Sequence, residues 1–133
     1  MKPVSALLQD LYLEMLAGME RRLESAARLG SYVRPRQMVL AEEDDAPPEE
    51  VDILNDFLAE YHFALQAITL DFAYFHSPFR RPLPPCPTLS GGAGQAIKAV
   101  DRLDRYAEAL RKAITGKKER ISRWNGRFGG QVP

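Results

Sequence analysis

Residues 51–75, VDILNDFLAEYHFALQAITLDFAYF, decide the fold of this chain because they carry its strongest apolar repeat. Large apolar side chains recur at alternating intervals of four and three residues, which places them on one face of an α-helix. These side chains are Leu54, Leu58, Tyr61, Leu65, Ile68, Phe72 and Phe75. The pattern predicts a helix over residues 48–76 with one continuous core-facing stripe.

The second half of this helix is apolar on its other faces as well. Phe63, Leu70 and Tyr74 lie off the core-facing stripe. A helix that is apolar almost all round needs neighbours on more than one side. We therefore expect a central helix or one that binds a partner through these three side chains.

A second helix is predicted over residues 5–29. Ser5 is a suitable N-cap, and Gly30 is a suitable C-cap in the left-handed conformation. Residues 31–40 lose the helical period, and Pro35 disfavours continuation of the helix, so we expect an extended connection there. The apolar stripe of this helix consists of Leu7, Leu11, Met15, Met19 and Leu23, flanked by Leu8, Tyr12 and Leu16.

The third predicted helix covers residues 93–115, with Gly116 as its C-cap. Its apolar stripe is narrower than that of the central helix. It consists of Ala93, Ala96 or Ile97, Val100, Leu103, Ala107, Leu110 and Ile114.

The connections between the helices differ in kind. Residues 41–50, AEEDDAPPEE, hold six carboxylates and two prolines, which predicts a solvated acidic loop. Residues 77–92 are rich in proline and glycine, so they form an extended crossover with polyproline character. Such a crossover is long enough to run back along a helix, which would let the second and third of the three helices pack in parallel.

Together these segments predict an all-α protein, an elongated three-helix bundle with a proline-rich extended crossover and a basic C-terminal tail. The bundle domain occupies residues 1–116, and the tail occupies residues 117–133. Polar residues interrupt the N-terminal apolar stretch, and no run is long enough for a membrane span. With a single cysteine, Cys86, the chain has no internal disulfide, and we expect a cytoplasmic protein without a membrane partner.

Charge is divided between the two parts of the chain. Residues 1–76 hold 6 Lys and Arg against 14 Asp and Glu, whereas residues 77–133 hold 12 against 4, so the net charges are −8 and +8. Single-sign surfaces attract oppositely charged partners. Contact between the acidic part of one copy and the basic part of another would favour rings or filaments.

The basic C-terminal region leaves two kinds of partner open. Cationic side chains neutralise phosphates and flat rings stack on exposed bases, which indicates nucleic acid. Trp and Arg are also common anchors in protein interfaces, which indicates protein docking. The candidate residues are Arg111, Lys112, Lys117, Lys118, Arg120, Arg123, Trp124, Arg127 and Phe128.

Two further segments could bind proteins. Phe79, Arg80 and Arg81 open the stiff crossover, which either reaches a partner or is fixed to its own bundle. The carboxylates of the acidic loop could occupy a basic site on another protein, as an inhibitor from a phage or mobile element would. These carboxylates are Glu42, Glu43, Asp44 and Asp45.

The sequence contains no catalytic signature. Cys86 lies between two prolines with no neighbour that would activate it, and His62 and His76 show no metal-ligand spacing. We predict no metal, no cofactor and no small-molecule substrate. The expected function is therefore that of a non-enzymatic helical subunit of a larger assembly, with protein neighbours on the central helix and crossover and nucleic acid on the basic tail.

Overall fold

The computed structural model describes residues 3–42, 48–75, 79–86 and 94–124. It contains three long helices, α1 (Val4–Glu42), α2 (Pro48–Phe75) and α3 (Gly94–Ser122), and the described residues contain no strand. The predicted all-α three-helix bundle is confirmed.

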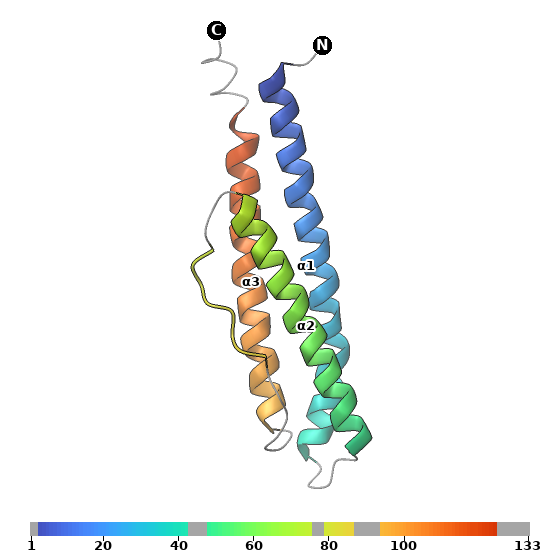
Figure 1. Ribbon diagram of the computed structural model, residues 1–133. Helices are drawn as coiled ribbons and strands as arrows, with labels where there is room; N and C mark the ends of the chain where they lie inside the picture. Colours follow the sequence, from blue (N-terminus) through green and yellow to red (C-terminus); the bar gives the residue numbers. More distant parts are fainter. Residues whose placement is uncertain (1–2, 43–47, 76–78, 87–93, 125–133) are drawn as a thin grey trace.

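The bundle is elongated, and α1 runs along nearly its whole length (Figure 1). The next helix, α2, returns antiparallel to α1, and α3 runs in the same direction as α2 (Figure 1). The extended crossover between α2 and α3 runs back beside α3, as its length and proline content led us to expect. Both α2 and α3 pack more extensively on α1 than on each other.

The core lies along the axis between the three helices. The predicted stripe of α2 is buried from Leu54 to Phe72, and α1 contributes four core side chains that begin only at Leu16. The buried residues of α1 are Leu16, Met19, Leu23 and Ala26, and those of α3 are Val100, Leu103, Tyr106, Ala107, Leu110, Ile114 and Ile121.

The described part of the crossover is packed on the bundle. Phe79 and Leu83 contact the core cluster, and the Phe79 ring meets the Tyr106 ring edge-on, with 5.3 Å between centroids. A ring nitrogen of His62 lies 2.8 Å from the carbonyl oxygen of Pro84. Of the two arrangements considered for this segment, the described residues adopt the one fixed to their own bundle.

The predicted end of the first helix at Gly30 is wrong. Helix α1 continues through Gly30 and Pro35 to Glu42. A proline removes one backbone donor and strains one turn, but a long helix can continue past it. Gly30 has a different role, because a Cβ added there would lie 3.2 Å from both an Asp104 carboxylate oxygen and a Tyr61 ring carbon. Glycine is suited to this position by close packing.

The predicted end of the third helix at Gly116 is also wrong. Helix α3 continues to Ser122, and Ile121 is completely buried in the core. The buried side chain of Gln9 donates a hydrogen bond of 2.9 Å to the carbonyl oxygen of Ile121. This bond satisfies a carbonyl that helix ends leave without an intrahelical partner. The described first residues of the predicted tail therefore belong to the bundle.

Candidate functional site

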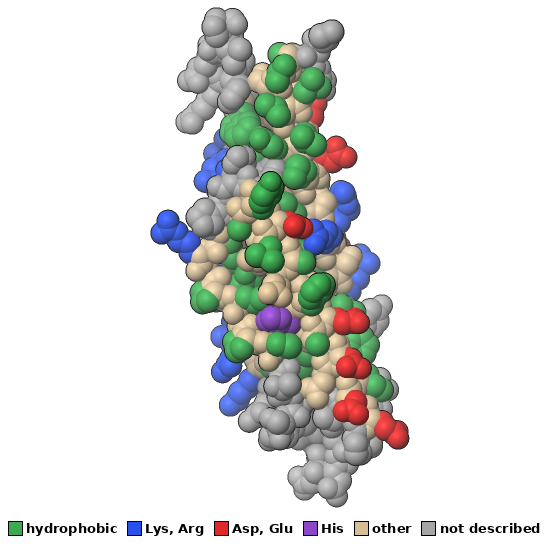
Figure 2. Space-filling model, viewed as in Figure 1, with side chains coloured by type: hydrophobic (Ala, Val, Ile, Leu, Met, Phe, Trp, Pro, Cys, Tyr) green, Lys and Arg blue, Asp and Glu red, His purple; other side chains and the backbone are tan. Residues whose placement is uncertain are grey.

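The outer face of α2 exposes three large apolar side chains. Phe63 is 70% exposed, Leu70 is 64% exposed and Tyr74 is 93% exposed. Their spacing of seven and four residues keeps them on one line of the helix, opposite the buried stripe that contains Leu65 and Phe72. In Figure 2, hydrophobic side chains follow the exposed side of α2. The structure thus leaves uncovered the three α2 residues that the sequence suggested for partner binding.

The same face of α2 is acidic in its first half. Asp52 and Asp56 are exposed and precede Leu70 and Tyr74 by 18 residues each, which is about five complete turns of an α-helix. Carboxylates gather over this half of α2 at the lower right of Figure 2. We call the line from Asp52 to Tyr74 the α2 outer face.

A second exposed apolar surface lies on the N-terminal part of α1. Five large side chains there are between 42% and 72% exposed. They are Val4, Leu7, Leu8, Leu11 and Met15. The sequence presents them as part of one stripe with Met19 and Leu23, but only the later members of that stripe are buried. Sequence reasoning therefore missed this surface.

The missing cover is α2 itself. Further along α1, the side that faces α2 is marked by the ion pair between Arg22 and Asp71. The same contact region contains a groove between the two helices. It is lined by Gly18, Arg21, Arg22, Ser25, Ala26, Leu29, Ala64 and Ile68.

The exposed residues of α1 continue this α2-facing side. Leu7, Leu8 and Leu11 precede Ser25, Ala26 and Leu29 by 18 residues each, again about five turns. Because α2 ends at Phe75, soon after the Arg22–Asp71 pair, it does not reach them. The bundle therefore has only two helices at this level.

The last turns of α3 form the other side of this two-helix region. Gln9 of α1 contacts Ile121, and the Tyr12 ring meets the Trp124 ring edge-on, with 5.8 Å between centroids. We use the term open end for Val4, Leu7, Leu8, Leu11 and Met15 of α1 together with Lys117, Arg120 and Arg123 beside them on the α3 side. The half-buried Trp124 ring is engaged within the chain.

The predicted basic residues of α3 fall into two groups. Two have partners, since Lys118 Nζ lies 2.9 Å from Glu20 Oε1 and Arg111 Nε lies 2.9 Å from Glu108 Oε2. The Arg111 contact lowers the pKa of Glu108. In contrast, Lys112, Arg120 and Arg123 are exposed.

Lys117 is only half-exposed. Its pKa is lowered by burial and by the nearby charge of Arg120. This pKa shift reflects a lysine stem that lies in the less polar surroundings of the open end.

The crossover arginines join two arginines that sequence spacing did not single out. Arg80 and Arg81 are exposed, and Arg81 lines a small groove with Arg102 and Arg105 of α3. This groove has a volume of about 280 Å³. Phe79, also predicted to bind a partner, is half-buried against Tyr106.

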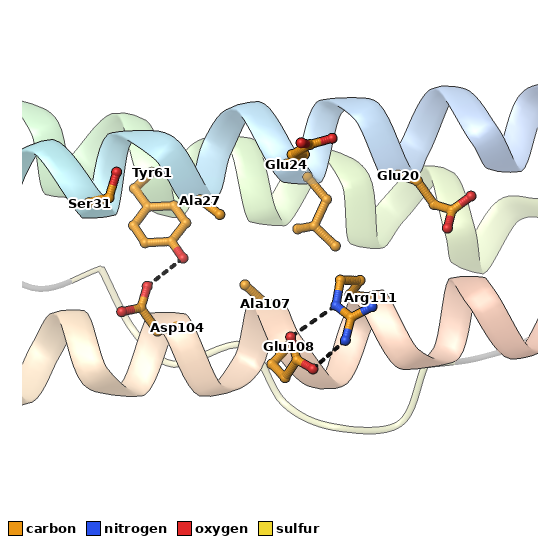
Figure 3. Close-up of a pocket in the computed structure, with 10 residues that line it drawn as sticks. Glu20, Glu24, Ala27, Ser31, Tyr61, Asp104, Ala107, Glu108 and Arg111 are labelled. Atoms are coloured by element: carbon orange, nitrogen blue, oxygen red, sulfur yellow. Dashed lines mark hydrogen bonds and ion pairs between the residues drawn. The ribbon is translucent and has the colours of Figure 1, made fainter.

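The largest groove lies between α1 and α3 and has a volume of about 700 Å³ (Figure 3). Tyr61 reaches into it from α2 and donates a hydrogen bond of 2.7 Å to Asp104. Its other carboxylates, Glu20, Glu24 and Glu108, also have partners. No cluster of three metal-ligating side chains occurs among the residues described.

Several predicted site residues cannot be placed. Glu42 is the last residue of α1. Glu43, Asp44 and Asp45 of the acidic loop lie outside the described residues, as do Arg127 and Phe128.

Comparison with known proteins gives no family. No protein-family model matches the chain, no curated protein matches it at a significant level, and no solved structure matches it. Within the described ranges, none of the helices has the length and apolar character needed to cross a membrane.

Proposed function

We propose that this chain is a non-enzymatic helical subunit of a larger assembly and that it binds a protein neighbour through the α2 outer face. The observation that supports this proposal is the exposure of Phe63, Leu70 and Tyr74 along one line of α2. Scattered apolar residues are normal on protein surfaces, whereas an aligned set of large side chains is typical of an interface.

The spacing of these side chains indicates the type of contact. Residues seven and four apart on one helix form a seam into which a partner helix can insert its own apolar side chains. Aromatic residues are frequent interface anchors because they bury a large area with few rotatable bonds. Phe63 and Tyr74 are accordingly expected to dominate the binding energy.

The experiment compares proteins recovered with tagged wild-type chain and with a Phe63→Gln, Tyr74→Gln variant from the source cells. A stably bound protein should be recovered with the wild-type chain and lost with the variant. Gln66→Asn is the matched control, because Gln66 is exposed on α2 but lies off this line. Equal recovery with both variants would contradict the proposal.

Nucleic acid is a second candidate partner, supported by the groove that brings Arg81, Arg102 and Arg105 together. Cations from two segments that are distant in sequence form one basic surface, to which a phosphate backbone could bind. Since Trp124 packs on Tyr12 within the chain, we propose backbone contact without base stacking by this ring.

This second candidate is tested with a labelled single strand and a labelled duplex at several salt concentrations. Arg102→Glu and Arg105→Glu should weaken binding and flatten its salt dependence. A Glu60→Gln variant on α2 should bind as the wild type does. Absence of binding at low salt would reject nucleic acid as a partner of this surface.

A further inference from the structure

We propose that the protein neighbour is a second copy of this chain, whose open end receives the α2 outer face of the first. The inference rests on the proposed function, since it names the partner of the same α2 surface. It explains the two exposed apolar surfaces together, because each would cover the other.

The two surfaces correspond in length and chemistry. The exposed residues of α1 extend from Val4 to Met15, and those of α2 extend from Phe63 to Tyr74, so each segment has 12 residues. Each is therefore about 17 Å long at the helical rise. Both present large apolar side chains on a single side of their helix.

The open end is shaped to receive a helix. Along the rest of α1, the side that continues Leu7, Leu8 and Leu11 is already covered by a helix, α2. Beyond Phe75, only α1 and α3 remain at this level of the bundle. A helix from a second copy would restore there the three-helix packing found in the rest of the molecule.

Charge favours the same pairing. The first half of the α2 outer face carries Asp52 and Asp56, and the open end carries Arg120 and Arg123. All four side chains are exposed. Opposite charges on the two surfaces attract each other, whereas pairing of two open ends would bring two sets of arginines together.

The assembly that follows is directional. The contact joins two different surfaces, so each copy retains one unused surface of each kind at the ends of the assembly. Such heterologous contacts produce rings if the rotation closes and filaments if it does not.

The experiment uses the purified full chain and two variants, each altered on one surface only. Leu8→Gln with Leu11→Gln alters the open end, and Phe63→Gln with Leu70→Gln alters the α2 outer face. All four side chains are at least 43% exposed, so circular dichroism and thermal unfolding should show that both variants fold. Sedimentation velocity at increasing protein concentration then gives their sizes.

We expect the wild-type chain to form dimers and larger species and each variant alone to remain monomeric. An equimolar mixture of the two variants should form a one-to-one dimer that grows no further, because each retains the surface that the other lacks. A fluorophore on Cys86, which is exposed, gives the affinity of this dimer. High salt should weaken it about tenfold or more, since opposite charges support the contact.

A monomeric wild-type chain at all concentrations, or a mixture that forms no dimer, would overturn the inference. If the tagged chain still recovered a different protein through Phe63 and Tyr74, the proposed function would stand with another partner. If the α2 substitutions changed neither result, both proposals would fail.

Discussion

At the scale of single residues, two glycines show how one signal has different structural meanings. Gly30 and Gly116 both follow an apolar stripe, where glycine commonly ends a helix. Both lie inside helices in this structure. Gly30 faces Tyr61 and Asp104 at close range, whereas a Cβ at Gly116 would have no neighbour within 4 Å.

We predict opposite effects of alanine at these two positions. Gly116→Ala should stabilise the protein by about 0.5–1 kcal/mol, because alanine favours a helix and meets no neighbour there. Gly30→Ala should destabilise it by about 1 kcal/mol, because Tyr61 is buried and hydrogen-bonded to Asp104 and cannot easily move. Urea unfolding followed by circular dichroism measures both changes. Destabilisation by Gly116→Ala would instead indicate a helix end at that residue.

Tyr106 makes stability depend on high pH. It is buried, its hydroxyl lies 2.8 Å from that of Thr69, and burial raises its pKa in spite of this hydrogen bond. The unfolded chain therefore loses the Tyr106 proton more readily than the folded chain. The resulting stability is fully present below about pH 10 and is lost as the pH rises from there through the raised pKa.

Tyr106→Phe should remove this contribution. We expect the variant to be about 1 kcal/mol less stable at neutral pH, because one hydroxyl contact is lost while Thr69 still donates to the carbonyl of Leu65. Its free energy of unfolding should fall less steeply than that of the wild type above about pH 10. Parallel pH curves for the two proteins would show that Tyr106 does not contribute to the alkaline loss.

At the scale of elements, the crossover and α1 acquire their roles from their neighbours. The crossover packs Phe79 and Leu83 on the core, which helps to explain why α2 and α3 have few direct contacts. Helix α1 has one apolar stripe in sequence, but the length of α2 divides that stripe into a buried part and the open end. In both cases, the partner element decides what each residue does.

We predict that the start of the crossover contributes to stability. Phe79→Ala should destabilise the protein by about 2 kcal/mol, because a half-buried ring is removed from Tyr106. Arg80→Ala is the matched control, since the adjacent side chain is exposed. The midpoints of chemical unfolding of the two variants test this difference. If they shift equally, Phe79 does not contribute specific packing to the bundle.

At the scale of the whole molecule, the fold brings the chain termini to the same end (Figure 1). The last described turns of α3 pack beside the first turns of α1 through the Gln9–Ile121 and Tyr12–Trp124 contacts. The acidic first half of α2 lies toward the other end (Figures 1 and 2). The charge division of the sequence is thus partly arranged along the long axis of the bundle.

Two truncations test where the bundle ends. A chain that stops after Gly116 should lose about 3–5 kcal/mol, because it lacks buried Ile121 and leaves Gln9 without its helix-end carbonyl partner. A chain that stops after Trp124 should retain the stability of the full chain. Thermal unfolding compares the three chains. Equal stability of both truncated chains would place the end of the bundle at Gly116.

The sequence by itself determined the helices and their buried faces, because the period of large apolar side chains is a local property. The stripe from Leu54 to Phe72 and the exposure of Phe63, Leu70 and Tyr74 followed from it. Helix ends were less predictable, because a glycine or proline only shifts a local balance. Burial of Ile121 and the close approach of Gly30 to Tyr61 are long-range contacts that accompany the continued helices.

Only the tertiary structure decided the open end. Leu8, Leu11 and Leu23 belong to the same apolar region of the sequence, but α2 ends before it can cover the first two. Likewise, only the fold brought Arg102 and Arg105 beside Arg81. Exposure depends on which element lies opposite a side chain, and that is fixed by the lengths and directions of all three helices together.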